Sequence, residues 1–564
     1  MRDHRQIMAW LHRVLTGLVA GIAMTAVLAA NAAAQPQSGG TIVTIPGVGL
    51  GSSSAVNGLN PLLTSSAYDA QVEGLMYRPL LWIDRHLHID FDRSIARAIR
   101  VSNDDTMFTI DLHRHWRWSD GVPVTTRDVA YTYHMILKLG ARYPDYEGGG
   151  VPTEVKTFAV LGPDRFRITT THPVNPQWFE LNGLGKLVPL PEHAWHGYSV
   201  HGFTEHLEDP AYFKVVDGPF RLERFQLGRY VSLVANPVYS GPDKAHIDRI
   251  VFKFMSSPES IFFALKSGTL KLADLPWQLY PARKQLAAYR SVAVGPSWGF
   301  NYVGFNYNAP AIRFIRDVRI RQAIMDAIDQ DQIIRVQYFG YGVRDYGPIP
   351  VNPPGFLSAR ARELMRKGAY DPAQADRLLD AAGWHMGPDH VRRKDGRPLK
   401  ITLLVTPDRV GEMVMIKNML AKVGIDLELR EMPFNQVVAE IMDPHNTQWQ
   451  AIFLAWTLAP YPSQKSLFGC GSTYNAYHYC DHHLDTLADA VRAKPGDAAL
   501  LAFEDAFIEQ QPVVVVPSYK VFIEAAAHIH GLAQAFSPMG GFNPQYLWID
   551  HRATVQGTPG SGTH

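Results

Sequence analysis

A strand, a turn and a helix follow one another in the hydrophobic pattern of residues 106–138. From Met107 to Trp118, apolar and polar residues roughly alternate, as in a strand with one buried face. Ser119-Asp120-Gly121 is a turn sequence, and Thr125 with Asp128 has the spacing of a capping box at a helix start. Apolar residues then recur at helical spacing: Val129, Tyr133 and Ile136. The pattern therefore predicts a strand, a turn and a capped helix.

The second half of the chain alternates between strand-like and helix-like segments. One helix is predicted after Asp317, and another begins at Asp371-Pro372 and ends at Gly383. Strands are predicted over residues 399–405, 425–429 and 451–456, and helices over residues 412–423 and 434–441. This alternation predicts an α/β lobe in which helices pack on a sheet.

Between these regions, residues 298–308 read WGFNYVGFNYN, with aromatic and amide side chains interleaved. A binding cleft needs aromatic surface to bury a ligand and a few polar groups to orient it. An ordinary buried strand has the same composition, and on the residues alone it is the simpler interpretation.

Residues 1–34 are expected to be a secretory signal peptide, cut near Ala34. Arg2, Arg5 and Arg13 precede an apolar run over residues 14–30, and small residues follow it. The alternative is a membrane anchor, because the run is nearly long enough to span a bilayer. The alanine-rich exit favours cleavage, and without a cysteine near the cut a lipid anchor is not expected. We expect an exported protein that is soluble after cleavage.

The composition argues against a nucleic-acid partner, and the cysteines raise the question of a disulfide bond. Lys plus Arg number 54 and Asp plus Glu number 53, so no basic surface for nucleic acid is expected. A length of 564 residues suits two or three domains. Cys470 and Cys480 are the only cysteines, and in an exported chain a disulfide is expected, with a metal pair as the alternative. Residues 553–564 are rich in Gly, Thr and Ser and are expected to form a flexible tail.

The sequence contains no common catalytic motif. It has no nucleophile elbow, phosphate-binding loop or dinucleotide fingerprint. Cys480-Asp481-His482-His483 offers metal ligands, but adjacent side chains diverge on a regular element and no spaced motif supports them. We therefore expect no catalytic residue, no metal and no cofactor.

Two motifs closely resemble those of the family 5 extracellular solute-binding proteins, the peptide-binding components of ABC importers. Residues 116–129 fit the pattern W-x-W-S-D-G-x-P-V-T-x-x-D-V, and residues 317–329 read DVRIRQAIMDAID. Looser likenesses follow in the family's order at Asn60-Pro61, at residues 217–220 and at residues 236–239.

The resemblance implies an α/β fold of the two-lobed periplasmic binding protein type II, in its large, peptide-binding class. Lobe one would comprise residues 38–297, with an inserted subdomain at about 85–195. Lobe two would comprise residues 298–518, and residues 519–552 would return to lobe one.

The resemblance also suggests ligand-binding residues. Thr64 and Ser65 match a loop that offers backbone groups to a bound peptide. Arg409 lies near an arginine that pairs with the peptide carboxylate, although a surface arginine is an equal alternative. Further candidates lie at the lobe crossing, at the end of a cleft strand and between the cysteines: Trp298, Phe300, Asn301, Tyr302, Trp456, Thr457 and Asn475.

One segment departs from the family pattern. After Trp456-Thr457, dipeptide-binding relatives continue with an acid that holds the ammonium group of the peptide, whereas residues 458–464 read LAPYPSQ. A free ammonium group would have no charge partner there. Standard dipeptide recognition is therefore in doubt.

We expect a monomeric periplasmic binding protein that captures a peptide or peptide-like solute and delivers it to an ABC transporter permease. The missing acid also admits a sugar, an opine, a modified peptide or a metal chelate. A secreted hydrolase and a receptor-docking sensor are the alternatives from other classes.

Overall fold

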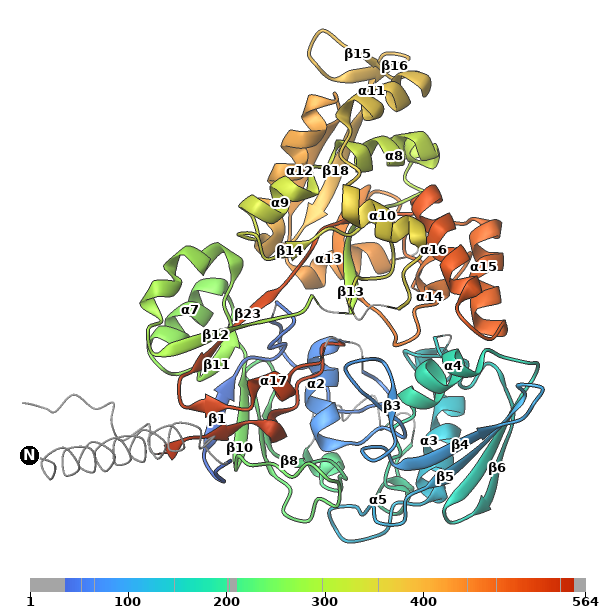
Figure 1. Cartoon of the computed structure of the whole chain (residues 1–564), viewed down its shortest axis with the longest axis vertical. Helices are drawn as coiled ribbons and strands as arrows, with labels where there is room; N and C mark the ends of the chain where they lie inside the picture. The colour runs from blue at the N-terminus through green and yellow to red at the C-terminus, as the bar shows by residue number, and fades with distance from the viewer. Residues whose placement is uncertain are drawn as a thin grey trace, which may run out of the picture.

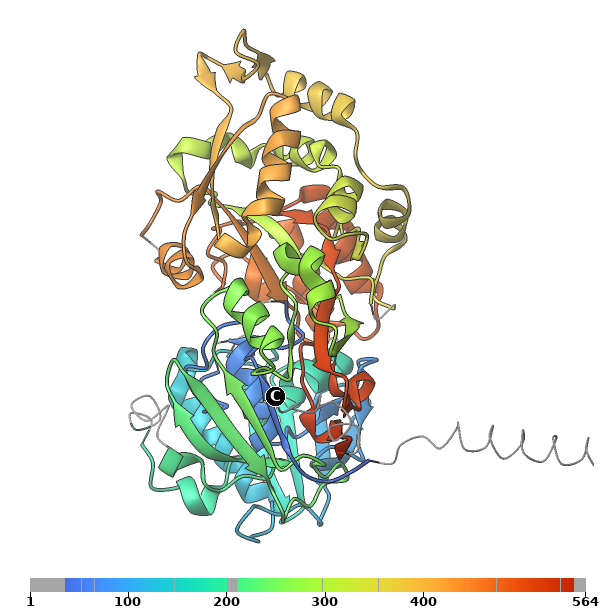
Figure 2. The same ribbon diagram turned by 90° about the vertical axis from the view of Figure 1, so that its left-hand side faces the viewer.

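The structure, a computed structural model, describes residues 36–551 except 52, 65, 147, 200–201, 203–209, 297, 353–354, 444, 473 and 538. The predicted signal peptide, the predicted tail and Ser65 lie outside these residues. The described chain forms two masses, one above the other in Figures 1 and 2, which we call lobe one (below) and lobe two (above).

Lobe one contains three main sheets and two short strand pairs. The first sheet has the order β1-β10-β9-β8 and the second β4-β5-β7-β6, while the third has the order β11-β23-β12. Their strands are β1 (Thr41–Thr44), β4 (Ala96–Val101), β5 (Met107–Leu112), β6 (Val155–Gly162), β7 (Arg165–Thr170), β8 (Phe220–Gln226), β9 (Tyr230–Ala235), β10 (Arg249–Lys253), β11 (Leu272–Asp274), β12 (Tyr289–Val294) and β23 (Val521–Ala526). The pairs are β2 (Trp82–Ile83) with β3 (Ile89–Asp90), and β24 (Ile529–His530) with β25 (Trp548–Ile549).

Several short helices cover these sheets (Figure 1). They are α2 (Ala67–Met76), α3 (Thr126–Leu139), η1 (Gly140–Arg142), α4 (Pro176–Trp178), η2 (Phe179–Gly183), η3 (Leu184–Lys186), α5 (Glu192–Trp195), η4 (Pro210–Phe213), α7 (Pro258–Lys266), η5 (Trp277–Gln285), α17 (Leu532–Ala535) and η8 (Pro544–Tyr546).

The capped helix predicted from the sequence is present as α3. The Thr125 side chain accepts a backbone hydrogen bond at the helix start and the Asp128 carboxylate accepts one from Thr125 N, which completes the capping box. The preceding strand is shorter than predicted, since β5 ends at Leu112 rather than at Trp118. The chain bends after Leu112 and buries both Trp116 and Trp118 completely, so the alternation there reflects a buried loop.

Lobe two is built around a five-stranded sheet in the order β19-β18-β20-β13-β21. β18 pairs in parallel with both β19 and β20, and β13 pairs antiparallel with β20 and β21. The strands are β13 (Gly299–Phe305), β18 (Lys400–Val405), β19 (Asp426–Glu431), β20 (Ala451–Thr457) and β21 (Val514–Val516). Two small sheets add β14 (Gly342–Val343) with β22 (Ser518–Tyr519), and β15 (His385–Met386), β16 (Arg392–Lys394) and β17 (Arg397–Pro398).

The helices of lobe two pack around this sheet, as the α/β pattern predicts (Figure 1). They are η6 (Pro310–Arg316), α8 (Val318–Ala327), α9 (Gln330–Val336), α10 (Ala359–Lys367), α11 (Pro372–Ala381), η7 (Pro407–Arg409), α12 (Val410–Lys422), α13 (Phe434–Met442), α14 (Lys465–Phe468), α15 (His482–Ala493) and α16 (Ala498–Gln510). No helix among the described residues has the length and apolar character that a membrane crossing needs.

The two lobes are joined by two neighbouring strands. β12 and β23 pair antiparallel over six residues, up to Val294 opposite Val521. The chain continues from β12 into β13, and it reaches β23 from β21 and β22. Figure 2 shows this strand pair rising between the two masses. Both crossings therefore belong to one ribbon.

A buried arginine anchors the end of α16 to α8. Arg321 is 2% exposed, and its guanidinium donates to the carbonyl oxygens of Gln510 (2.7 Å), Gln511 (2.8 Å) and Ile315 (2.6 Å). The last carbonyls of a helix lack intrahelical partners and carry partial negative charge, so a cation stabilises them.

We expect Arg321→Lys to lower the free energy of unfolding by about 2 kcal/mol, because one ammonium group cannot reach three carbonyls placed for a planar fork. Urea unfolding followed by tryptophan fluorescence measures this change. Arg366→Lys is the control, since the Arg366 side chain is 67% exposed and pairs with Glu363 of the same helix. Equal effects of the two substitutions would contradict the anchoring role.

Candidate functional site

The ends of β13 and β20 form the most accessible part of the predicted site. Gly299 lies opposite Thr457 and Phe300 opposite Trp456 in the strand register. Trp456 is half-buried and Thr457 is exposed, whereas the first residues of β20 are buried. β20 therefore leaves the interior of lobe two at these two residues.

The run over residues 298–308 begins as the buried strand β13. All residues from Gly299 to Phe305 are buried, because β13 lies between β20 and β21. The polar atoms of Trp298 and Asn301 already have protein partners: Trp298 Nε1 donates to Ala459 O at 3.0 Å, and Asn301 Nδ2 donates to Pro517 O at 3.2 Å.

Tyr302 fills the interior behind the strand. Its side chain is completely buried, and its hydroxyl lies 2.6 Å from the hydroxyl of Tyr477. This contact favours a structural role for Tyr302. Of the four residues predicted on this strand, Phe300 and Trp298 lie nearest to the accessible Trp456, by register and by sequence.

Arg409 lies at the start of α12, where its side chain is 12% exposed. Its guanidinium lies over the ring of Tyr519 at 4.6 Å and donates to the Tyr519 hydroxyl. Its Nε lies 3.3 Å from a carboxylate oxygen of Asp408. Aromatic and acidic neighbours thus partly enclose this charge, and its role in ligand binding stays a prediction.

A buried acid lies one turn further along α12. Glu412 is 1% exposed and accepts a hydrogen bond from the Tyr338 hydroxyl at 2.6 Å. Burial raises the pKa of Glu412 to about 7, although the nearby Arg409 charge and the Tyr338 hydrogen bond act in the opposite direction. Arg409, Glu412 and Tyr519 of β22 thus form a buried polar cluster in lobe two, next to the start of β23.

Thr64 belongs to lobe one and is distant in sequence from the lobe-two strands. It is partly exposed, and its hydroxyl donates to Pro61 O at 3.3 Å and to the buried carboxyl of Glu73. Burial raises the pKa of Glu73 to about 8. Its predicted neighbour Ser65 falls outside the described residues, so the proposed backbone contact of this loop stays a prediction.

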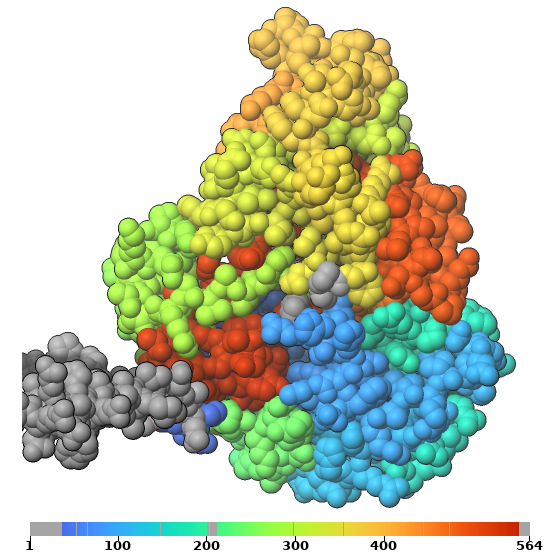
Figure 3. Space-filling view, in the orientation of Figure 1, coloured from blue at the N-terminus to red at the C-terminus, as the bar shows by residue number. Residues whose placement is uncertain are grey.

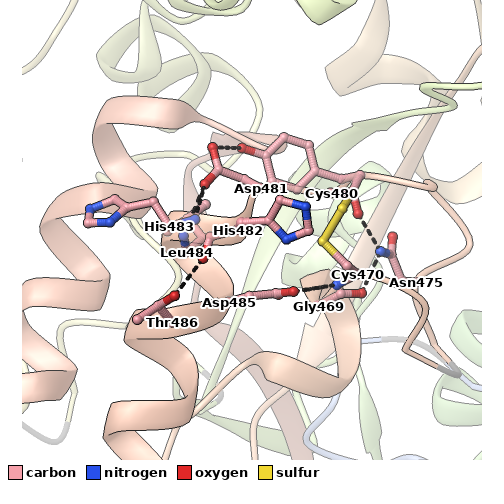
Figure 4. The surroundings of a disulfide bond; sticks show 11 residues. Gly469, Cys470, Asn475, Cys480, Asp481, His482, His483, Leu484, Asp485 and Thr486 are labelled. Atoms are coloured by element: carbon pink, nitrogen blue, oxygen red, sulfur yellow. Dashed lines mark hydrogen bonds between the residues drawn. A yellow bond between two sulfur atoms is a disulfide. The ribbon is translucent and has the colours of Figure 1, made fainter.

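Cys470 and Cys480 form the predicted disulfide bond (Figure 4). Asn475 lies within the enclosed loop, where its Nδ2 donates to Gly469 O at 2.8 Å and to Tyr479 O at 2.6 Å. These bonds favour a structural role for Asn475. The two sulfur atoms and a ring nitrogen of His482 lie within 4.8 Å of one another, but the sulfurs are joined to each other and are not free thiolates.

Contacts between the lobes were not predicted from the sequence. The Asn182 amide of lobe one bonds the backbone of Tyr461, and the Tyr474 hydroxyl donates to Pro144 O at 2.7 Å. The ring of Tyr474 lies 5.7 Å from that of Trp456. The exposed end of β20 therefore lies close to a place where the lobes touch.

A hollow is visible between the two lobes in the space-filling view (Figure 3). It is bordered by residues of lobe two in yellow and by residues of lobe one in red and green. A separate, shallow depression of about 640 Å³ lies on β8 and β9 of lobe one and contains none of the predicted site residues. The interlobe hollow is the better candidate, because the accessible residues of β20 lie beside interlobe contacts.

The family described as "Bacterial extracellular solute-binding proteins, family 5 Middle" matches residues 90–478. The oligopeptide-binding protein AppA of Bacillus subtilis is 23% identical over 455 residues, which are 80% of this chain and 80% of AppA. The structure of AppA with a nonapeptide has a TM-score of 0.74 at 20% identity, covering 92% of this chain and 100% of that one.

Two further solved structures share the fold. NikA from Brucella suis in complex with Fe(III)-EDTA has a TM-score of 0.74 at 21% identity, covering 91% of this chain and 100% of that one. AgaA from A. tumefaciens in complex with agropinic acid has a TM-score of 0.69 at 20% identity, covering 91% and 99%. These likenesses confirm the predicted α/β fold class.

The buried Glu412 predicts a pH-dependent stability. Between pH 4.5 and about 7, the unfolded chain ionises this carboxyl while the folded chain keeps its proton, so stability falls as the pH rises through this window. We expect Glu412→Gln to remove up to about 3 kcal/mol of this fall.

Urea unfolding of wild type and Glu412→Gln at several pH values measures the difference. Glu431→Gln is the control, because Glu431 is exposed at the end of β19. A constant difference between wild type and Glu412→Gln from pH 4.5 to 7.5 would contradict the buried neutral carboxyl.

Proposed function

Because the chain belongs to the family 5 extracellular solute-binding proteins, the non-enzymatic substrate-binding components of ABC transporters, we propose that it captures a peptide or peptide-like solute between its lobes. The observation that carries this proposal is the emergence of Trp456 and Thr457 from the lobe-two sheet beside interlobe contacts. An aromatic face and a free strand end at one place suit an extended chain with apolar side groups.

Arg409 would hold an anionic end of the solute. A guanidinium binds a carboxylate through two parallel hydrogen bonds, and Arg409 is enclosed enough for such a pair to be strong. Its present partners, the Tyr519 hydroxyl and Asp408, would have to yield part of this coordination. The solute would therefore carry a carboxylate or another planar anion.

The segment at residues 458–464 supports a solute without a free ammonium group at its other end. This segment contains no acid, and the backbone of Tyr461 is occupied by Asn182. The names of related proteins point to peptides, while the solved complexes of NikA and AgaA hold a metal chelate and an opine. An opine, a sugar or a metal chelate is therefore the second candidate class.

We place this capture in the periplasm, after removal of a signal peptide near Ala34. The two lobes would close over the solute by bending at the β12 and β23 ribbon, and the closed monomer would deliver it to a permease. No cofactor takes part in this cycle.

Mass spectrometry of solute released from the purified protein tests the class directly. A peptide, or a modified peptide without a free ammonium group, supports the proposal. An opine, a sugar or a metal chelate would instead support the second candidate class. If neither tryptic peptide pools nor panels of these other solutes raise the melting temperature, solute capture itself fails.

We expect Trp456→Ala to weaken binding of a tryptic casein peptide pool by about tenfold or more, because the solute loses buried aromatic surface. Isothermal titration against wild type measures the change. Tyr370→Ala is the control, since Tyr370 is also aromatic and is 43% exposed, but lies outside β13 and β20. An unchanged affinity in Trp456→Ala would remove this residue from the site.

A further inference from the structure

One side chain of lobe one bonds the backbone of lobe two in both directions. Asn182 Nδ2 donates to Tyr461 O at 2.6 Å, and Asn182 Oδ1 accepts from Tyr461 N at 2.9 Å. Asn182 is 2% exposed and Tyr461 is completely buried. The amide thus mimics a strand neighbour, and both of its polar atoms are satisfied where water has no access.

An unusual turn presents Asn182. The residue lies in η2, a π-helical turn from Phe179 to Gly183, and such turns are rare and often occur at functional sites. Glycines make the turn possible: a Cβ on Gly149 would lie 2.0 Å from Asn182 O, and one on Gly183 would lie 2.4 Å from Gly149 O. The backbone of the turn therefore packs directly on the backbone of a neighbouring loop.

Further contacts at the same seam hold the two lobes in register. Asn175 Nδ2 donates to Val491 O at 3.0 Å, and its backbone N donates to Arg492 O at 2.7 Å. The Arg492 guanidinium pairs with Glu154 at 2.6 Å and lies over the ring of Trp178 at 4.9 Å. These groups come from α4 and the residues next to α4 and β6 on one side, and from α15 on the other.

Tyr461 is linked closely to the candidate site. Leu458 N donates to Trp298 O at 2.9 Å, and Trp298 Nε1 donates to Ala459 O, so residues 458–461 continue directly from the end of β20. The ring of Phe356 lies 6.0 Å from Trp298 and 5.6 Å from Tyr461. A shift of Tyr461 would therefore disturb the packing of Trp298 and the end of β20 that carries Trp456.

We propose that Asn182 is a positioning residue for solute capture: its amide clamps Tyr461 and so fixes both how the lobes approach each other at this seam and the position of the end of β20. The role in capture rests on the proposed function, whereas the clamp itself does not. The Asn182 amide carries no charge, so a solute bound near this end of the site would not need a charged group to pair with it.

Hydrogen exchange of the full mature chain, without added solute, tests the clamp. In Asn182→Ala, we expect amide exchange in a peptide spanning residues 458–464 to rise by about tenfold, because two hydrogen bonds are lost. Asn182→Asp keeps the acceptor for Tyr461 N but places a carboxylate oxygen against Tyr461 O in a buried site, so exchange should rise at least as much as in Asn182→Ala.

Tyr461→Phe is the comparison variant: it keeps the backbone that Asn182 binds and removes the hydroxyl, which accepts from Asn175 Nδ2 at 3.3 Å and donates to Gly496 O at 3.3 Å. We expect it to raise exchange in this peptide by less than Asn182→Ala does, because both bonds of the Asn182 amide are kept. Small-angle scattering of the same samples should show a larger radius of gyration for Asn182→Ala than for Tyr461→Phe, which loss of local packing alone would not produce.

Unchanged exchange at residues 458–464 in both Asn182 variants, or an unchanged radius, would overturn the proposal. If Asn182→Ala does not fold, the comparison of Asn182→Asp with Tyr461→Phe decides it. Because no solute is added, failure of peptide capture and failure of the clamp are separate results.

Discussion

The pairing of β12 with β23 is the constraint on which the rest of the structure depends. Six residue pairs place the outgoing and returning chain side by side, so the two lobes share one paired connection. A few residues at the end of such a connection can act as a hinge between lobes. At the lobe-two end of this ribbon, where Val294 pairs with Val521, β12 continues into β13 and Tyr519 of β22 leads into β23.

Buried polar groups are satisfied in two different ways in this protein. The Arg321 guanidinium donates to backbone carbonyls, and the Asn182 amide bonds a backbone carbonyl and a backbone N–H of the other lobe. Glu412 and Glu73 are instead kept close to neutral by burial, each with a hydroxyl as its partner. The first kind fixes the arrangement of elements, and the second makes the stability of each lobe sensitive to pH.

Local features of the fold could be predicted from the sequence because their causes are local. The caps at Thr125, Asp317 and Asp371 accept backbone hydrogen bonds near their own helix starts, as expected from spacing alone. The alternating segments of lobe two appear as β18, α12, β19, α13 and β20, with shifts of one or two residues at their ends. The disulfide followed from the compartment and from the cysteine count.

The site was harder to predict because its contacts join distant residues. Nothing near Tyr302 in the sequence indicates that its hydroxyl meets Tyr477, and nothing near Asn182 indicates Tyr461, which is 279 residues away. The π-helical turn depends on Gly149, a residue of another loop. The position of β23 in the lobe-one sheet also affects the order of assembly during export. Because β23 lies near the C-terminus and joins β11 to β12, lobe one cannot complete that sheet until nearly the whole chain has crossed the membrane. Lobe two completes its central sheet only slightly earlier, because that sheet includes β21 (Val514–Val516), which shortly precedes β23 in the sequence.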